Sequence, residues 1–430
     1  MVPYKELSRE ELERERRAMQ KEHDLLRAKG YHLDMSRGKP CTAQLDLSND
    51  MLDVVNSKTD VHSERGADCR NYGDVAGIDE AKRMLGDMVD VAADHVIVWG
   101  NSSLSVMHDV ICNSMIKGVL GSTPWCQLDS VKFLCPVPGY DRHFTITEYY
   151  GIEMINIPMN EDGPDMDLVE KYVNNDPAVK GIWCVPKYSN PQGITYSDEV
   201  VRRFANLNPA AEDFRIFWDN AYCVHHLYED KQDHLLEILN ECEKAGRPDM
   251  VYEFFSTSKV TFAGAGISGV AASKRNLEEI RKQMSVKIIS FDKLNMLRHA
   301  KYLVDQDGIQ AKMKQHAEIM RPKFEMVLNK LTTDLKPLGI ARWIEPRGGY
   351  FVAFEAMDGC ATRIIELASQ AGLTMTPAGA PFPYHKDPKD SVIRIAPSYP
   401  SEEELAMAME IFVVCVKLAS AEHMLKYMEA

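Results

Sequence analysis

The sequence contains no long apolar run. Stretches such as His95–Trp99 and Phe412–Val416 are far shorter than the roughly 20 residues that a membrane-spanning helix needs. We therefore expect no transmembrane segment and no membrane partner. The first ten residues also lack the apolar core of a signal peptide and lead into a densely charged stretch, so we expect a cytoplasmic protein.

An excess of positive charge is also missing. Fifty Lys and Arg residues stand against 64 Asp and Glu residues, which gives a formal net charge of −14. Proteins that bind nucleic acid depend on clustered positive charge, so this balance argues against a DNA or RNA partner. Any site for an anion must be local.

The ten cysteines form no C-x-x-C pair and no repeated spacing, which argues against a disulfide framework or a zinc ribbon. The segment Cys223-Val-His225-His226 does combine a thiol with imidazoles, and both groups are good zinc ligands. Adjacent residues of this kind more often pack in a core or line a substrate wall. We therefore predict no metal site.

Short apolar segments do recur between about residues 64 and 275, where they alternate with helical patterns or turn residues. Strands that alternate with helices predict an α/β fold with a mostly parallel sheet, flanked by helices on both faces. Ligands of such sheets bind at the carboxyl ends of the strands. The seven predicted strands are His95–Trp99, Val131–Cys135, Glu153–Ile157, Gly181–Val185, Arg215–Trp218, Tyr252–Phe255 and Gly269–Ala272.

The two ends of the chain have different patterns. Ser8–Lys29 is predicted to be a charged helix that begins with a capping box of Ser8 and Glu11. A long helical pattern over Asn295–Asp334 leads into a smaller α+β unit. Its predicted strands are Arg342–Ile344, Tyr350–Phe354, Leu373–Met375 and Val392–Ile395, and its helices are Thr362–Gln370 and Glu402–Met424. We expect an N-terminal arm and part of the small domain in residues 1–63, a large domain in 64–303 and a small domain in 304–430.

Residues that could take part in catalysis or ligand binding stand at the ends of the predicted strands. Lys259 follows an apolar strand, together with the hydroxyls of Ser256 and Ser258. Lysine is costly to bury and is used where a desolvated amine acts as a nucleophile or forms a Schiff base. An exposed loop lysine is the commoner explanation of such a pattern.

A second strand delivers Asp219 and, three residues later, Tyr222. A carboxylate in this place can hold a protonated ring nitrogen such as that of pyridoxal phosphate, and the phenol can donate to the phenolate oxygen of that ring. The alternative is a helix-capping aspartate beside a core tyrosine. Asn190, in the Asn-Pro-Gln-Gly turn, can bind the same oxygen or simply belong to a tight turn.

Two further segments suggest anion sites. Gly100-Asn101-Ser102-Ser103 links a strand to a helix, and a helix N-terminus with free N–H groups and hydroxyls can bind phosphate. Arg394 lies inside an apolar strand, where a buried guanidinium needs an anion and matches a carboxylate bidentately. For Arg394 the sequence leaves two alternatives open, a substrate carboxylate and a structural salt bridge.

Together, in this order, these motifs resemble those of the fold type I pyridoxal-phosphate enzymes, in particular the class I/II aminotransferases. The separations of 29 residues from Asn190 to Asp219 and 40 from Asp219 to Lys259 are close to those of the family. Other matching segments are Asn71-Tyr72-Gly73, Pro138-Gly139-Tyr140 and Pro346-Arg347-Gly348-Gly349-Tyr350-Phe351. Ser36-Arg37-Gly38-Lys39-Pro40 and the Ser258–Gly266 segment look most like the MocR-type aminotransferase branch, to which bacterial aspartate aminotransferases belong.

The resemblance implies a pyridoxal 5′-phosphate cofactor and a role for each candidate residue. Lys259 would bind the cofactor covalently and move the proton, and Asp219 would pair with the pyridinium nitrogen. Asn190 and Tyr222 would hold the phenolate oxygen, and Tyr140 would stack on the ring. The implied phosphate-binding residues are Ser102, Ser103, Ser256, Ser258 and, from a neighbouring subunit, Tyr72; the implied substrate-binding residues are Gly38, Asn190 and Arg394.

One feature departs from the family pattern. A basic residue normally follows the lysine by about eight positions and pairs with the phosphate, but Val260–Gly269 contains no Arg or Lys and the position falls near Ile267. Lys187 and Lys274 are candidate replacements. A distal substrate carboxylate would need another cation, for which the available residues are Arg37, Lys39, Arg142, Lys293 and Arg298.

We therefore predict an aminotransferase that takes an amino group from an amino acid and passes it to a 2-oxo acid in a ping-pong cycle. Aspartate and 2-oxoglutarate are the expected substrates, mainly because of the branch resemblance. An alanine-type or broad-specificity aminotransferase, β-elimination on a cysteine conjugate and a MocR-like regulatory domain are the alternatives. The role implied for Tyr72 predicts a homodimer with shared active sites.

Overall fold

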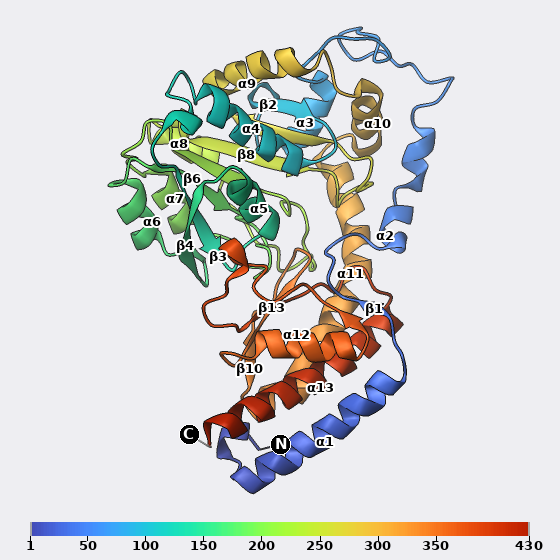
Figure 1. Ribbon diagram of the computed structural model, residues 1–430. Helices are drawn as coiled ribbons and strands as arrows, with labels where there is room; N and C mark the ends of the chain where they lie inside the picture. Colours follow the sequence, from blue (N-terminus) through green and yellow to red (C-terminus); the bar gives the residue numbers. More distant parts are fainter. Residues whose placement is uncertain (1, 429–430) are drawn as a thin grey trace.

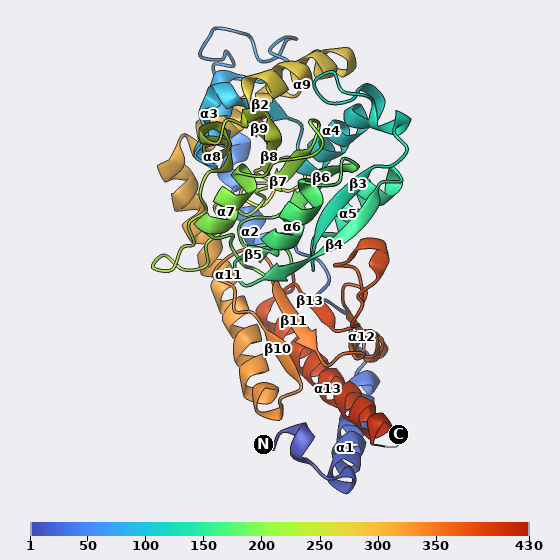
Figure 2. The same cartoon turned by 90° about the vertical axis from the view of Figure 1, so that its left-hand side faces the viewer.

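A computed structural model describes residues 2–428 of the chain. A large α/β unit lies above a smaller unit that is formed by the C-terminal residues together with the N-terminal helix (Figure 1). The long helix α11 (Gln306–Asp334) runs from one unit to the other. The same layering is visible after a quarter turn (Figure 2).

The large unit contains an eight-stranded sheet in the order β2-β9-β8-β7-β6-β3-β4-β5. The five central strands from β8 to β4 are parallel, whereas β9 is antiparallel to both of its neighbours. The strands are β2 (Val96–Trp99), β3 (Lys132–Val137), β4 (Glu153–Asn160), β5 (Gly163–Pro164), β6 (Val179–Cys184), β7 (Arg215–Asp219), β8 (Val251–Ser256) and β9 (Ser268–Ala272). All seven expected strands are present, which confirms the predicted fold class.

The eighth strand was missed because β5 has only two residues and pairs with the end of β4 as a hairpin. Such a short segment carries no alternating apolar pattern. Helices cover both faces of the sheet, as expected for strands that are buried on both sides. One face packs against α3 (Asp79–Asp87), α6 (Met166–Val173), α7 (Asp198–Ala205) and α8 (Ile238–Lys244), and the other against α4 (Ser103–Lys117), α5 (Asp141–Tyr149) and α9 (Lys274–Lys287).

The single long helix predicted over Asn295–Asp334 is wrong. Two helices, α10 (Lys293–Leu303) and α11, are separated at Val304, whose φ is 64°. Asp305 caps α11 by accepting a hydrogen bond from the Gly308 N–H group. The apolar periodicity continues across this break, so the pattern alone did not reveal it.

The smaller unit is built around a three-stranded antiparallel sheet in the order β10-β11-β13. Its elements are β10 (Ala341–Trp343), β11 (Val352–Ala356), α12 (Ala361–Gln370), β12 (Leu373–Thr374), β13 (Val392–Ile395) and α13 (Glu402–Tyr427). Strand β1 (Leu33–Asp34) pairs with β12 and so joins the N-terminal segment to this unit. The division of the chain near residues 63 and 303 stays a prediction.

The N-terminal helix α1 (Arg9–Ala28) begins with the predicted capping box of Ser8 and Glu11. It lies along α13 in both views (Figures 1 and 2) and buries Leu12 and Leu26 in the core of the smaller unit. The short helix α2 (Thr42–Asp46) follows. A long segment then leads over the surface to α3 (Figure 1).

Candidate active site

The candidate residues meet at the carboxyl end of the central strands. Asp219 is the last residue of β7 and pairs in register with Phe254 of β8, and Lys259 follows the end of β8. Asn190 lies in the loop after β6, the other neighbour of β7. Because these three strands are parallel, their following loops lie at one edge of the sheet.

Asp219 has one oxygen paired and one without a partner. His143 of α5 donates from Nε2 to Asp219 Oδ2 at 2.8 Å, and its ring stacks on Trp183 with centroids 4.4 Å apart. Asp219 is 2% exposed, and its Oδ1 accepts no hydrogen bond from any residue the structure describes. A buried carboxylate oxygen in this state is suited to a ligand N–H donor, ideally a cationic one.

The amine of Lys259 lies beside two tyrosine rings. Its Nζ is 5.0 Å from the centre of the Tyr222 ring and 5.7 Å from that of Tyr350. Burial lowers the pKa of the Lys259 amine, and the negative charge of Asp219 opposes this shift. A lowered pKa favours the neutral amine that a nucleophile or a Schiff base requires.

Three histidines hold the peptide that follows this lysine. His225 Nε2 lies 3.4 Å from the Lys259 carbonyl oxygen and His316 Nε2 lies 3.0 Å from that of Val260. The next residue, Thr261, bonds through its hydroxyl to His299 at 2.9 Å. Burial lowers the pKa of all three imidazoles, to about 4 for His316 and His299, so they remain neutral donors and acceptors at physiological pH.

The hydroxyl groups predicted to bind phosphate lie in one place. Ser256 and Ser258 bond to each other at 3.1 Å, and the Ser258 hydroxyl donates to the Asn101 carbonyl at 3.1 Å. Ser102 is the N-cap of α4 and Ser103 its first residue, and the Ser102 side chain makes no capping bond. A helix N-terminus with neighbouring hydroxyls is a suitable anion cradle.

Neither proposed replacement for the missing basic residue reaches this cradle. Ile267 is in the core at 2% exposure. Lys274 opens α9 beyond the opposite end of β9 and pairs with Asp94 at 2.9 Å. Lys187 lines a separate cavity of about 340 Å³. Neither lysine therefore has a contact that would support the suggested role, since Lys274 is paired with Asp94 and Lys187 faces another cavity.

A cation does lie beside the turn that follows Lys259. Asn295 of α10 donates to the carbonyls of Ala265 and Gly266 at 3.1 Å, and Arg298 donates to the Asn295 amide oxygen.

Of the other cations considered for a distal carboxylate, Lys293 is only 1% exposed and binds Asp74 and the Tyr72 carbonyl, both at 3.3 Å.

The remaining three have different surroundings. Arg37 is largely exposed and lies 3.6 Å from Asp34. Lys39 lies over the Tyr399 ring at 3.9 Å, and Arg142 is an exposed residue of α5.

Arg394, on β13, faces the large unit. Its Nη1 donates to Asp141 Oδ1 at 3.0 Å and to Asn190 Oδ1 at 3.3 Å, and its Nη2 donates to the Thr376 hydroxyl at 3.3 Å. The guanidinium carbon lies 4.8 Å from the centre of the Phe351 ring. The salt bridge that the sequence left open as an alternative therefore exists, and Asp141 is its acceptor.

Gly38 and Tyr140 complete the surroundings of Arg394. A Cβ atom at Gly38 would lie 2.1 Å from the Phe351 ring, so only glycine allows the N-terminal segment to approach this closely. Tyr140 contacts the edge of the His143 ring, with centroids 4.9 Å apart, and burial together with the Asp219 charge raises its pKa to about 12. Tyr140 thus lies near Asp219, and its stacking on a cofactor ring stays a prediction.

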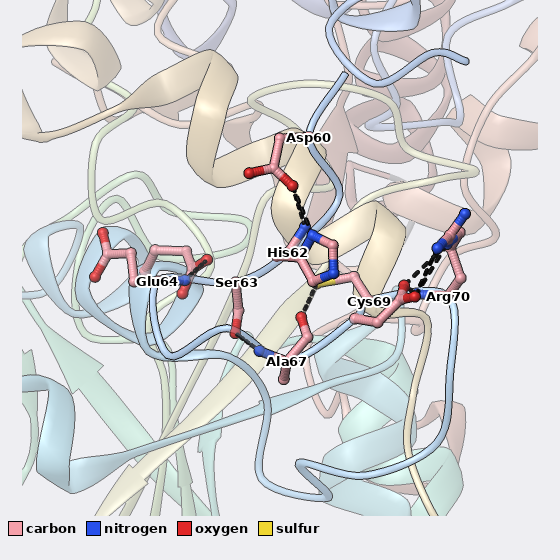
Figure 3. A network of polar contacts seen from close by, with 9 residues as sticks. Asp60, His62, Ser63, Glu64, Ala67, Cys69 and Arg70 are labelled. Atoms are coloured by element: carbon pink, nitrogen blue, oxygen red, sulfur yellow. Dashed lines mark hydrogen bonds and ion pairs between the residues drawn. The ribbon is translucent and has the colours of Figure 1, made fainter. Parts of the chain in front are cut away.

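Tyr72 is not in the site of its own chain but on the surface, at 77% exposure. The preceding segment is ordered by local contacts, which include His62 with Asp60 at 2.7 Å and Arg70 with Asp68 at 2.7 Å (Figure 3). A tyrosine presented in this way is available to another molecule.

Sequence reasoning missed several residues of the site. His143 and Asp141 stand next to the Pro138-Gly139-Tyr140 motif, and a polar residue in the first turn of the following helix was a usable signal. Gln44 and His316 left no such signal. Gln44 donates to Tyr350 at 2.9 Å and lies 3.2 Å from His316 Nδ1, across 272 residues of sequence.

Comparison with known proteins agrees with this geometry. A protein of Mycolicibacterium smegmatis is 43% identical over 426 residues, 99% of each chain. An aspartate aminotransferase of Corynebacterium glutamicum is 44% identical over 406 residues, 94% of this chain and 93% of that relative. The crystal structure of an aspartate transaminase from C. glutamicum superimposes with a TM-score of 0.95 at 42% identity and covers 98% of this chain and 99% of the other.

Fold and site thus define an aminotransferase with the fold type I architecture. The family model for aspartate amino-transferase matches residues 7–427, and the chain belongs to that family. Among residues 2–428, no helix has the length and apolarity needed to cross a membrane.

Proposed function

We propose that the protein is a pyridoxal-5′-phosphate-dependent aminotransferase that transfers the amino group of aspartate to 2-oxoglutarate. The observation that carries this proposal is the half-paired carboxylate of Asp219, buried at the same strand ends as the Lys259 amine. The unpartnered oxygen fits a protonated ring nitrogen, and the serine cradle beside α4 fits a phosphate.

The cofactor, when bound, supplies an electron sink and a carrier for the amino group. Lys259 would hold it and would move a proton at the substrate Cα through its amine. Asp219 would keep the ring nitrogen protonated, and His143 orients that carboxylate. Asn190 and Tyr222 would donate to the phenolate oxygen, and Tyr140 would cover one ring face.

Two sets of residues would bind the remaining anionic groups. Arg394 would bind the substrate α-carboxylate, because a guanidinium fork matches a carboxylate and so fixes the Cα–H bond for proton removal. Asn190 and Gly38 lie beside it. The phosphate would be held by Ser102, Ser103, Ser256 and Ser258, and Arg298 is our candidate for the missing basic charge.

Aspartate is proposed as the donor because the C. glutamicum relative of 44% identity bears that name. An alanine-type or broad-specificity aminotransferase is the alternative, and the donor panel described below separates it from the aspartate enzyme. Placement in the MocR-type branch and a cytoplasmic location stay predictions from the sequence.

A homodimer is proposed because Tyr72 is displayed on the surface instead of in its own site. Mixing Tyr72→Ala with Lys259→Ala subunits tests this. Each mixed dimer would contain one intact site, so random pairing should restore about a quarter of the wild-type activity. Activity that does not recover on mixing, or a fully active monomer in a dilution series, would contradict the proposal.

The function itself is tested by absorbance and by a panel of donors. The protein incubated with pyridoxal phosphate should show a band near about 420 nm that is absent in Lys259→Ala and shifts when aspartate is added. Comparing kcat/KM for aspartate, alanine and aromatic donors with 2-oxoglutarate then decides the substrate. The absence of any band in the wild-type protein would overturn the proposed cofactor.

A further inference from the structure

The guanidinium of Arg394 already holds a carboxylate of its own chain. Asp141, the first residue of α5, accepts from Nη1 at 3.0 Å. The Arg394 side chain is 10% exposed, whereas that of Asp141 is 25% exposed. Asp141 therefore stands on the more accessible side of a buried cation.

The other edges of the guanidinium are less accessible. Nε is buried and finds no hydrogen-bond partner between residues 2 and 428. The Phe351 ring covers one face, and Thr376 accepts from Nη2 at 3.3 Å. The most accessible neighbour of the guanidinium is then Asp141, on the Nη1 edge, where Asn190 Oδ1 also accepts at 3.3 Å, and we take this edge as the one that an incoming carboxylate reaches.

Two carboxylates on one nitrogen repel each other and compete for the same donor. We propose that Asp141 is an internal counter-ion of Arg394 that the substrate α-carboxylate displaces when it binds. This inference rests on the proposed function, in which Arg394 is the carboxylate-binding residue. Asp141 thereby sets the affinity and the specificity of the site.

The exchange has a physical rationale on both sides. Without Asp141, the buried charge of Arg394 would lack an anion whenever no substrate is bound, and such a charge is costly. Once displaced, Asp141 remains in the first turn of α5, where the helix N-terminus favours a negative charge. A ligand without a carboxylate cannot make the exchange, and a weakly held inorganic anion competes poorly with a tethered one.

The test uses the holoenzyme and succinate, a dicarboxylate that has no amino group and cannot react. Asp141→Asn keeps the shape of the side chain but removes its charge. We expect succinate to bind about tenfold more tightly to this variant, as measured by calorimetry, since an ion pair no longer has to be broken. For the amino donor, the change should fall on KM more than on kcat.

Asp198→Asn is the matched control, because Asp198 is also the first residue of a helix and also pairs with an arginine, Arg202 at 3.3 Å. It should leave succinate binding unchanged. Asp141→Ala serves as a second variant in which no amide oxygen can replace the carboxylate, and it should shift the affinity in the same direction. Succinate should also raise the melting temperature of the Asp141 variants more than that of the wild type.

Weaker or unchanged succinate binding in both Asp141 variants would overturn the inference, since Asp141 would then position Arg394 or stay in place. Arg394→Gln separates this failure from that of the proposed function. If Arg394→Gln binds succinate as the wild type does, the proposed role of Arg394 fails. If it loses binding while the Asp141 variants are unchanged, only the displacement of Asp141 is disproved.

Discussion

Two buried aspartates lie at opposite ends of β7 and differ in how their oxygens are paired. Asp213, just before the strand, accepts from Lys180 at 2.6 Å on one oxygen and from Trp125 at 2.8 Å on the other. Asp219, at the carboxyl end, accepts from His143 on one oxygen, and no other residue in the described part of the chain donates to its second oxygen. Their exposures are nearly the same, at 6% and 2%.

The difference shows that burial alone does not distinguish a carboxylate with a structural role from one that is suited to binding a ligand. A buried carboxylate whose two oxygens both have donors needs nothing further, and removing it leaves its partners unpaired. A buried carboxylate with an unpartnered oxygen is tolerated at a cost, which a ligand can offset by supplying the missing donor. The comparison therefore indicates a stabilising role for Asp213, and the unpartnered oxygen of Asp219 is consistent with the cofactor role that we propose for it.

Asp219→Asn should have the largest effect. The amide cannot keep a ring nitrogen protonated by its charge, so we expect kcat/KM to fall by at least about 10³-fold, or about 4 kcal/mol of transition-state stabilisation. Melting temperature should change little or rise, because a buried charge is removed. Steady-state kinetics of the holoenzyme and a thermal scan of the same sample measure both quantities.

Asp213→Asn should reverse this pattern. It leaves the Lys180 ammonium, which is 10% exposed, without its counter-ion, and breaking a buried pair in this way costs about 3 kcal/mol of unfolding free energy. Urea denaturation measures the loss, and kcat/KM of the folded fraction should stay within about twofold. Equal losses of activity in the two aspartate variants would break the comparison.

The sequence allowed the prediction of one of these two aspartates. Asp219 was a candidate because a polar residue directly follows an apolar strand. Lys259 was a candidate because it comes soon after another apolar strand, and Asn190 because of its Asn-Pro-Gln-Gly turn. The sequence did not show how many oxygens of each aspartate are hydrogen-bonded, because the donors come from distant positions. His143 is 76 residues from Asp219, and Lys180 is 33 residues from Asp213. Only the packing of α5 and β6 against β7 brings them together.

The fold shows the same limit. The apolar strands of four or more residues and the capping box of Ser8 with Glu11 could be located from local pattern, and all seven such strands of the large sheet were. The break at Val304 and the two-residue strand β5 depend on tertiary contacts and carry no periodic signal. Lys187 and Lys274 were candidates only as nearby cations, and the sequence does not reveal at which end of a strand such a side chain emerges.

His143→Leu sharpens the comparison by removing the single donor of Asp219. We expect kcat/KM to fall by about 10- to 100-fold, because the carboxylate keeps its charge but loses its orientation. His143→Gln retains an N–H donor at a similar reach and should recover part of the loss. Full activity of the leucine variant would show that Asp219 needs no positioning partner.

The smallest effect is expected at His316 of α11, which donates to the Val260 carbonyl just after Lys259. His316→Leu leaves the buried Val260 carbonyl unpaired and should cost about 1–2 kcal/mol of unfolding free energy at pH 7.5. His316→Gln keeps a donor and should lose less. Urea denaturation of the apoprotein measures both, with His32→Gln, at an exposed histidine, as the control for the substitution itself.

The same variants make a prediction about pH. Burial lowers the pKa of His316 to about 4, below the roughly 6.5 of an unperturbed histidine, so the unfolded chain binds more protons between these values. Unfolding free energy must then fall as pH drops from about 6.5 towards about 4, and the loss levels off below that range. His316→Gln removes one such group, so its stability should depend less steeply on pH than that of the wild type. An unchanged slope would mean that His316 is protonated in the folded protein, and the neutral contact to Val260 would then be wrong.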